Sequence, residues 1–318
     1  MRFTRYELKR PNVALRVAST GAARIFGLCH DPQISLLTDF GTSGISHYEL
    51  ESAIGSITSH SNVRTITHEV PAGNVLIGAW RLWKAARRPT EQSGIIYVAV
   101  VDPGVGTDRK GIVVRTQTGK YLVGPDNGLL SLVTKEQGID RAVAIENREL
   151  TLLDHADSDT FHGRDVFVPV AAHLARGVPI EEFGSLLDPA TLTSITLLTD
   201  SNTTHRKGSI VDIDHVGEFG NIATTVPNHL PQELIGSVIS FRLRAPGIEL
   251  DARARLARTF ADGSSDDILF VPYSTGSLHL AVNRGNAAKR VGLSSTDIQL
   301  DGKFHPAAYV ELDLAHAT

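Results

Sequence analysis

The chain has 318 residues, of which 42% are hydrophobic and 21% are charged, so it has an ordinary globular composition and is long enough for two domains. The formal net charge of −4 excludes a general attraction to nucleic acid or anionic membrane, and the single cysteine, Cys29, excludes a disulfide framework and a cysteine-based zinc site. No apolar run approaches the roughly 20 residues that span a bilayer. We therefore expect a cytoplasmic protein whose partner is a small molecule, with no nucleic-acid and no membrane partner.

Residues 1–32 are expected to form a basic N-terminal extension. In residues 1–30, basic residues greatly outnumber the single acid, Glu7. An organelle-targeting peptide has the same composition and stays open as an alternative.

From residue 33 onward, apolar runs typical of strands alternate with amphipathic segments typical of helices. The predicted strands are 34–37, 63–66, 95–101, 111–115 and 121–123, and the predicted helices are 49–59, 75–87, 129–136 and 166–176. This alternation indicates an α/β domain with a mostly parallel central sheet.

The texture changes from about residue 191, where short β-like runs follow one another with no good helix between them. These runs are 208–213, 221–226, 236–243, 268–272 and 277–282. They indicate a small all-β barrel or sandwich. We place the α/β domain at residues 33–190, a linker at 191–204 and the all-β domain at 205–318.

Three polar groups of the α/β half are candidate site residues. Asp39 ends the first strand, where a carboxylate can bind vicinal ribose hydroxyls or cap a helix. Asp102 and Arg109 flank a glycine-containing loop after the third strand, so the guanidinium can pair with the carboxylate and orient it; the alternative is an exposed loop ion pair. His162 follows Phe161 and precedes Gly163, and it is either a titrating site residue or a structural histidine.

Two other readings of the residues stay open. Asp39, Asp102, His162 and Asp165 could converge on a divalent metal ion, as in metal-dependent hydrolases. In the all-β half, residues 212–214, 219–221 and 281–287 are polar turns or ligand contacts. The sequence lacks the glycine-rich and serine motifs of dinucleotide-binding, triphosphate-binding and serine-esterase sites.

Six segments, taken together, carry a resemblance to a known family. They read LTDFG at 37–41, VDPGVG at 101–106, GPDNGLL at 124–130, TFHGRD at 160–165, FGN at 219–221 and AVNRGNA at 281–287. In this order and spacing the chain resembles the S-adenosyl-L-methionine hydroxide adenosyltransferases, relatives of the fluorinase and chlorinase. The resemblance implies an α/β domain followed by a β-barrel, and a homotrimer with active sites at the subunit interfaces.

The resemblance also implies the chemistry. Water or hydroxide would attack C5′ of S-adenosyl-L-methionine and release adenosine and L-methionine, with no metal and no other cofactor. Methionine leaves as a neutral thioether, so no general acid is needed. Asp102, Arg109 and His162 match the positions proposed to orient and activate the water.

The substrate-binding residues are likewise implied by the resemblance. Asp39 would hold the ribose hydroxyls and Asp214 and Ser274 the methionine end, and Phe161 and Gly163 would also bind the substrate. The adenine and barrel-side wall would be formed by Phe219, Asn221 and Asn283.

Two departures and two rivals accompany this hypothesis. After the LTDFG motif the family usually has an acidic residue and later a methionine or lysine, whereas this chain reads GTSGISH at 41–47. Gly73 stands where relatives carry an aromatic residue against the ribose. Gly163 argues against fluoride as the nucleophile, and Asp102 with His162 makes a chlorinase the weaker alternative. A metal-dependent hydrolase and a non-catalytic sensor of an adenosyl ligand remain the rival functions.

Overall fold

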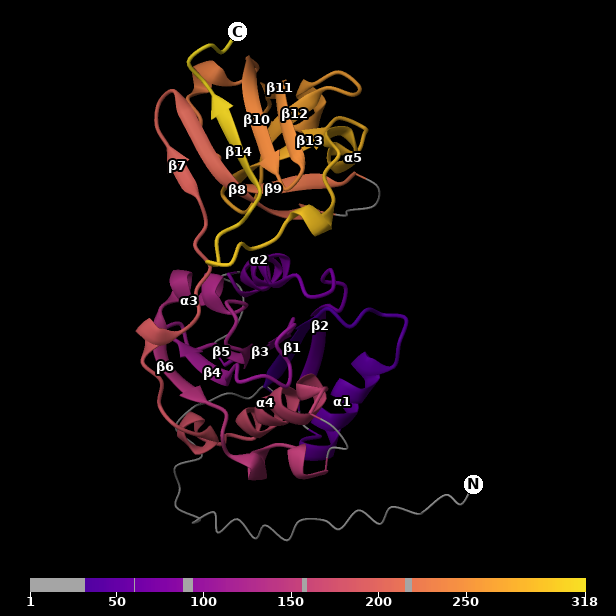
Figure 1. Ribbon diagram of the computed structural model, residues 1–318, viewed down its shortest axis with the longest axis vertical. Coiled ribbons are helices and arrows are strands. Elements are labelled where there is room, and N and C mark those ends of the chain that lie inside the picture. Colours follow the sequence, from indigo (N-terminus) through magenta and orange to yellow (C-terminus); the bar gives the residue numbers. More distant parts are fainter. Residues whose placement is uncertain (1–31, 60, 88–93, 156–158, 215–218) are drawn as a thin grey trace. The chain divides into compact units, whose positions relative to one another are not determined.

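The computed structural model describes residues 32–59, 61–87, 94–155, 159–214 and 219–318 (Figure 1). The predicted N-terminal extension and its targeting alternative lie outside the described residues, except for Pro32. Within the described ranges, no helix combines the length and the apolar character needed to cross a membrane.

The N-terminal half is built on a six-stranded sheet with the order β2-β1-β3-β5-β4-β6. Its strands are β1 (Gln33–Thr38), β2 (Asn62–Thr67), β3 (Ile96–Val100), β4 (Gly111–Thr116), β5 (Tyr121–Pro125) and β6 (Ile139–Ala144). Strands β2, β1, β3 and β5 are parallel neighbours, whereas β4 is antiparallel to both β5 and β6. A tight turn joins β4 to β5, and a parallel connection would need a dozen or more residues. The α/β class is thus confirmed, but the sheet is mixed and the expectation of a mostly parallel one is not confirmed.

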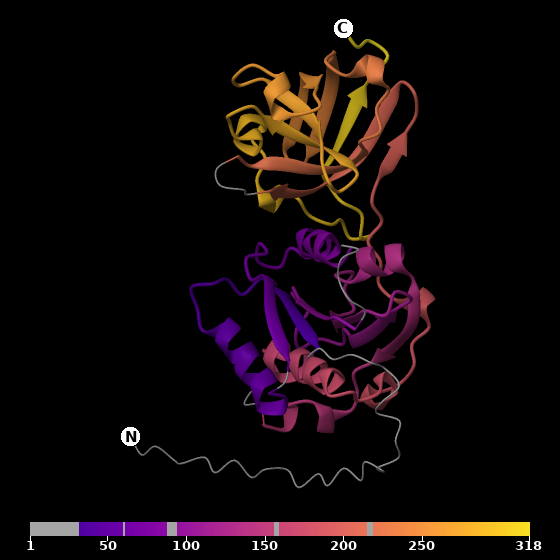
Figure 2. The same ribbon diagram turned by 180° about the vertical axis from the view of Figure 1, so that it is seen from behind.

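Helices cover both faces of this sheet, as the two opposite views agree (Figures 1 and 2). The helices α1 (Ser46–Ile57) and α4 (Val168–Ala175) lie on one face, and α2 (Val75–Ala86) and α3 (Ser131–Gln137) lie on the other. Successive residues of a strand point to opposite faces, so Leu36 packs with α1 and α4 while Leu37 packs with α2. Because helices cover both faces, side chains on either face of a central strand are buried. The central strands of this sheet therefore appear in the sequence as runs of apolar residues with no polar face.

The C-terminal half is a closed seven-stranded barrel, and its five predicted strands are all present. The strand order is β14-β10-β11-β12-β13-β9-β8, and pairing of β14 with β8 closes the ring; β7 (Thr199–Ser201) adds to β8. The barrel strands are β8 (His205–Asp214), β9 (Asn221–Pro227), β10 (Val238–Ala245), β11 (Ile248–Leu256), β12 (Ile268–Pro272), β13 (Ser277–Val282) and β14 (Tyr309–Asp313). Closure leaves no free edge in the ring, which answers the choice between barrel and sandwich.

Helix α2 connects the two halves through ion pairs. Arg81 donates from Nε and Nη2 to the two carboxylate oxygens of Asp212 on β8, at 3.0 and 2.9 Å. One turn further along α2, Lys84 Nζ donates to Asp214 Oδ1 at 2.9 Å. The C-terminal end of α2 is therefore anchored to the barrel, while its N-terminal end, at Asn74, borders the candidate site described next.

Candidate active site

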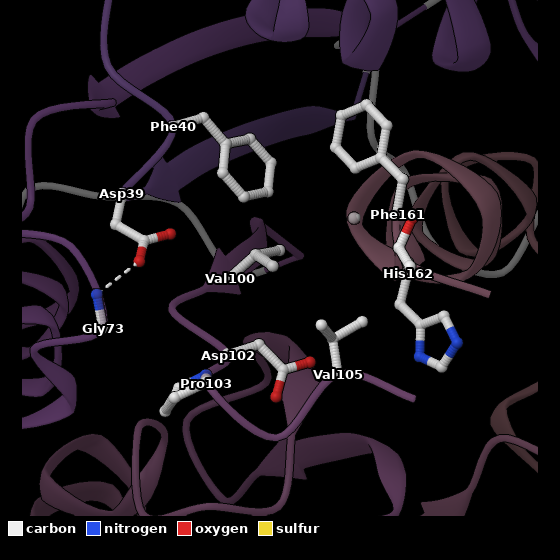
Figure 3. Close-up of a pocket in the computed structure, with 11 residues that line it drawn as sticks. Asp39, Phe40, Gly73, Val100, Asp102, Pro103, Val105, Phe161 and His162 are labelled. Carbon is white, nitrogen blue, oxygen red and sulfur yellow. Dashed lines mark hydrogen bonds between the residues drawn. The ribbon is translucent and has the colours of Figure 1, made fainter. Parts of the chain in front are cut away.

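A pocket lies where β1 and β3 end, at the same edge of the sheet (Figure 3). The two strands are parallel and Thr38 pairs with Val100, so the residues that follow them, Asp39 and Asp102, are brought to one side. The pocket has a volume of about 150 Å³. It is lined by Asp39, Phe40, Gly73, Val100, Asp102, Pro103, Val105, Thr160, Phe161, His162 and Gly163.

The loop after β3 folds back so that Arg109 meets Asp102. The N–H of Val105 donates to the carbonyl of Asp102 at 3.2 Å, and that of Thr107 donates to the carbonyl of Gly104 at 3.2 Å. Two consecutive turns therefore reverse the chain within eight residues. A Cβ on Gly104 would lie 3.3 Å from Arg109 Cγ, so glycine leaves room for the returning side chain.

Asp102, Arg109 and His162 form one hydrogen-bonded set. Arg109 Nε donates to Asp102 Oδ1 at 3.0 Å and to Oδ2 at 2.9 Å, and Nη2 also donates to Oδ2. Arg109 Nη2 lies 2.8 Å from Nδ1 of His162. Arginine has only donors, so Nδ1 must accept and the neutral ring carries its proton on Nε2. The exposed-loop alternative for the Asp102–Arg109 pair is therefore wrong, because both side chains are largely buried.

His162 is held in its neutral form by its surroundings. Burial lowers the pKa of the imidazole, and the positive charge of Arg109 lowers it further. Three carboxylates, Asp102, Asp159 and Asp165, oppose this effect without reversing it. The ring is thus a donor at Nε2 and has its one lone pair directed at Arg109.

Asp39 faces the pocket with one carboxylate oxygen already bound. The backbone N–H of Gly73 donates to Asp39 Oδ2 at 2.7 Å, the contact drawn in Figure 3. Burial raises the pKa of Asp39, and this backbone hydrogen bond only partly offsets the rise. The helix-capping alternative for Asp39 is wrong: Asn74 caps α2 by accepting from Ile77, and α1 has no side-chain cap.

Phe40 and Phe161 form an aromatic wall of the pocket, and Gly163 leaves the space that the Phe40 ring occupies. The rings of Phe40 and Phe161 meet edge to face with centroids 5.3 Å apart (Figure 3). A Cβ on Gly163 would lie 3.1 Å from the Phe40 ring, so a side chain there would force Phe40 to move. Phe40, Val100 and Val105 were not among the predicted site residues. Phe40 directly follows Asp39, and Val100 and Val105 lie within three residues of Asp102, which was the available signal.

The predicted residues of the barrel do not line this pocket. Asp214 is paired with Lys84, and the Ser274 carbonyl accepts from Arg87 at 3.3 Å. Phe219 is half exposed, Asn221 is buried in β9, and Asn283 donates to the carbonyl of Gly263 at 2.7 Å. The described part of one chain therefore brings together Asp39, Asp102, Arg109, Phe161, His162 and Gly163, but not the five barrel residues.

The four residues of the metal hypothesis do not form a metal site. Asp165 is buried against Arg164, which donates to its two oxygens at 2.7 and 2.9 Å. Both oxygens of Asp102 accept from Arg109. Among the described residues, no group of three or more His, Cys, Asp or Glu side chains is arranged to hold a metal ion.

The fold and the site together define a class: a mixed α/β domain and a closed β-barrel, with an Asp–Arg–His set in a pocket at the sheet edge. Comparison with known proteins assigns the family. Residues 34–184 match the N-terminal domain of the SAM hydroxide adenosyltransferases, and residues 208–298 match their C-terminal domain. The chain belongs to this family.

Individual relatives agree with this assignment. The chain is 34% identical over 268 residues to an (R)-S-adenosyl-L-methionine hydrolase from Salinispora tropica, covering 84% of this chain and 96% of the relative. It is 26% identical over 284 residues to a fluorinase from Actinopolyspora mzabensis, covering 81% and 92%. A crystal structure of an uncharacterized conserved protein from Thermotoga maritima matches with a TM-score of 0.74 and 32% identity, over 88% of this chain and 99% of that one.

Proposed function

We propose that this chain hydrolyses (R)-S-adenosyl-L-methionine to adenosine and L-methionine. The observation that carries the proposal is the Asp102–Arg109–His162 set at the pocket, in a chain that belongs to this family. In the reaction an oxygen–C5′ bond forms and the C5′–sulfur bond breaks. The electron pair of the broken bond neutralises the sulfonium, so methionine leaves uncharged and no general acid is required.

The tautomer of His162 bears on how the nucleophile is activated. Its Nδ1 is engaged by Arg109, so Nε2–H can donate to the attacking oxygen but cannot take a proton from it. Asp102 accepts from Arg109 through both oxygens and is a weak base in that state. We therefore assign this set to holding and stabilising hydroxide, which forms when a water molecule loses one proton to solvent before the attack. The charge of Arg109 is balanced by Asp102, so the Nε2–H of His162 is the donor that this set offers to the anion.

The size of the pocket limits what one chain can bind. About 150 Å³ is below the roughly 300–1,000 Å³ typical of pockets for drug-sized ligands, so it suits the ribose and C5′ but not the whole substrate. Asp39 would bind the ribose hydroxyls, with Phe161 and Gly163 beside the sugar.

The other ends of the substrate need a second surface. We propose a homotrimer in which the barrel of a neighbouring copy completes the site. Asp214 and Ser274 would then bind the methionine end, and Phe219, Asn221 and Asn283 would form the adenine side. The reaction as written uses no metal and no other cofactor.

The test is overnight incubation of the purified, metal-stripped protein with S-adenosyl-L-methionine in chloride-containing buffer, followed by separation of the nucleosides. Adenosine together with methionine is the expected result. Formation of 5′-chloroadenosine would make the protein a halogenase. Unchanged substrate would overturn the proposal. Retention of the ligand would then favour a sensor, and activity that returns with a divalent ion would favour a metal-dependent hydrolase.

A further inference from the structure

Phe167 contacts two of the three residues assigned to the nucleophile, although it does not line the pocket. Its side chain is fully buried. The guanidinium carbon of Arg109 lies 5.2 Å from the centre of the Phe167 ring, on its face. The His162 ring meets the same phenyl ring at 79°, with centroids 6.5 Å apart. One apolar ring thus supports both the cation and the imidazole that it bonds.

A local irregularity of the backbone makes this arrangement. Residues Gly163–Phe167 form a π-helical turn ahead of α4, in which the N–H of Val168 donates to the carbonyl of Gly163. In an α-helix of 3.6 residues per turn, side chains five residues apart point about 140° away from each other. The wider π turn brings positions five apart closer to one face, so His162 and Phe167 can meet.

The ring is confined on another side by the sheet. A Cβ on Gly111, at the start of β4, would lie 3.0 Å from Cε1 of Phe167, so the phenyl ring fills the space that the glycine leaves. The ring therefore has no space to shift toward β4. Since Arg109 and His162 pack on this ring, its fixed position restricts theirs.

We propose that Phe167, presented by the π turn, is a positioning residue for hydrolysis that holds Arg109 and His162 in register with each other. The inference rests on the proposed hydrolysis of S-adenosyl-L-methionine. Phe167 does not touch the substrate, and it acts through the two side chains it supports.

The experiment compares Phe167→Leu with Phe183→Leu. Phe183 is fully buried in the same apolar cluster, so its replacement controls for the loss of a core ring. Misplacing catalytic groups by an ångström costs on the order of 100-fold, so we expect kcat of Phe167→Leu to fall by about 10- to 100-fold. KM should change by less than about 3-fold, because Phe167 does not line the pocket and substrate binding should be largely retained. Phe183→Leu should keep the wild-type kcat in its folded fraction.

A pH profile separates positioning from general destabilisation. Loss of the ring admits water beside His162, so its pKa should rise toward the ordinary value, because burial is the main cause of its depression. Arg109, Asp102, Asp159 and Asp165 remain around it and keep their opposing effects. The acid limb of the rate profile of Phe167→Leu should therefore move to higher pH, whereas that of Phe183→Leu should not move.

The outcomes are distinguishable. If the wild type does not hydrolyse S-adenosyl-L-methionine, the proposed function fails. If the wild type is active and the two leucine variants match in kcat and pH profile, the inference about Phe167 is wrong. In a His162→Ala background, Phe167→Leu should cost much less than in the wild type, because groups that act together are not additive. Should the leucine variant not fold, Phe167→Met removes the ring with a smaller loss of volume and undergoes the same comparison.

Discussion

Two buried Arg–Asp pairs of similar geometry have different surroundings. Arg109 and Asp102 are 11% and 5% exposed, and Arg81 and Asp212 are 20% and 1% exposed. Asp102 lines the pocket, and Arg109 extends the pair to His162. Arg81, by contrast, uses Nη1 to donate to the carbonyl of Glu69 at 2.8 Å, and neither Arg81 nor Asp212 lines that pocket. The two pairs therefore differ in whether the carboxylate faces that pocket, and we expect only the Asp102–Arg109 pair to contribute to the chemistry.

The largest expected effect is loss of turnover on removing Asp102. Asp102→Ala leaves Arg109 without its counter-ion, so the guanidinium no longer orients His162 and the nucleophile. Misplacing reacting groups by an ångström costs on the order of 100-fold, and we expect kcat to fall by at least about that factor. Binding of S-adenosyl-L-methionine, measured by calorimetry, should be largely kept. An equal loss of binding and turnover would mean that Asp102 positions the substrate.

The matched substitution in the Arg81–Asp212 pair should lower the free energy of unfolding and leave kcat unchanged. Asp212→Ala leaves Arg81 near the barrel without a carboxylate, and breaking a buried pair costs about 3–5 kcal/mol. Urea unfolding of Asp212→Ala should show a loss in the free energy of unfolding near the lower end, since Arg81 is partly exposed. The kcat of the folded fraction should stay near that of the wild type. A 100-fold fall in kcat would show that the two pairs are not functionally distinct.

The sequence predicted strands in which apolar residues predominate. The bounds of β12 (Ile268–Pro272) and β13 (Ser277–Val282) match the expectation, although Ser277 and His279 interrupt the apolar run of β13. Strand β11 (Ile248–Leu256) was not predicted, because glutamate, aspartate and arginine alternate with its apolar residues. The alternation was itself a signal, since every second residue of a half-exposed strand faces water. The reversed direction of β4 could not be read from its composition.

Local motifs predicted Asp102, Arg109 and His162 as candidate site residues, because each lies at a glycine-containing junction of an apolar run. The structure brings these three side chains together, and their roles stay predictions. The π turn at Gly163–Phe167 was not predicted: it depends on which carbonyl the Val168 N–H selects, and no residue type specifies that choice. Roles of Asp214 and Asn221 depend on contacts beyond the pocket of one chain, so they stay predictions.

His279 extends the comparison to pH. It lies in the same region as the Arg81–Asp212 pair, is fully buried, and stacks on Tyr273 with centroids 3.8 Å apart. Burial lowers the pKa of His279 to about 4, although Asp214 opposes this effect. As pH falls below 6.5, His279 becomes protonated in the unfolded chain, whereas in the folded chain it stays neutral until about pH 4. The free energy of unfolding therefore decreases as pH falls from 6.5 to 4.

Replacing His279 should remove this dependence. The gap between the two pKa values corresponds to a loss of about 3 kcal/mol on acidification from neutral pH to below pH 4. In His279→Gln, urea unfolding at pH 7 and pH 4 should show a smaller drop than in the wild type by up to that amount. The comparison is made between drops, because other groups titrate in both proteins. Equal drops would mean that His279 is protonated in the folded state as readily as in the unfolded one.

An exposed Arg–Asp pair should show the smallest effect and complete the series. Arg148 Nε donates to Asp154 Oδ1 at 2.9 Å, a distance like those in the buried pairs, but the two side chains are 60% and 61% exposed. Water already solvates both charges, and such pairs contribute about 0–1 kcal/mol. Arg148→Ala should therefore change the free energy of unfolding by less than about 1 kcal/mol in urea, and kcat should not change. A loss as large as that of Asp212→Ala would show that hydrogen-bond geometry, and not burial, sets the contribution of these pairs.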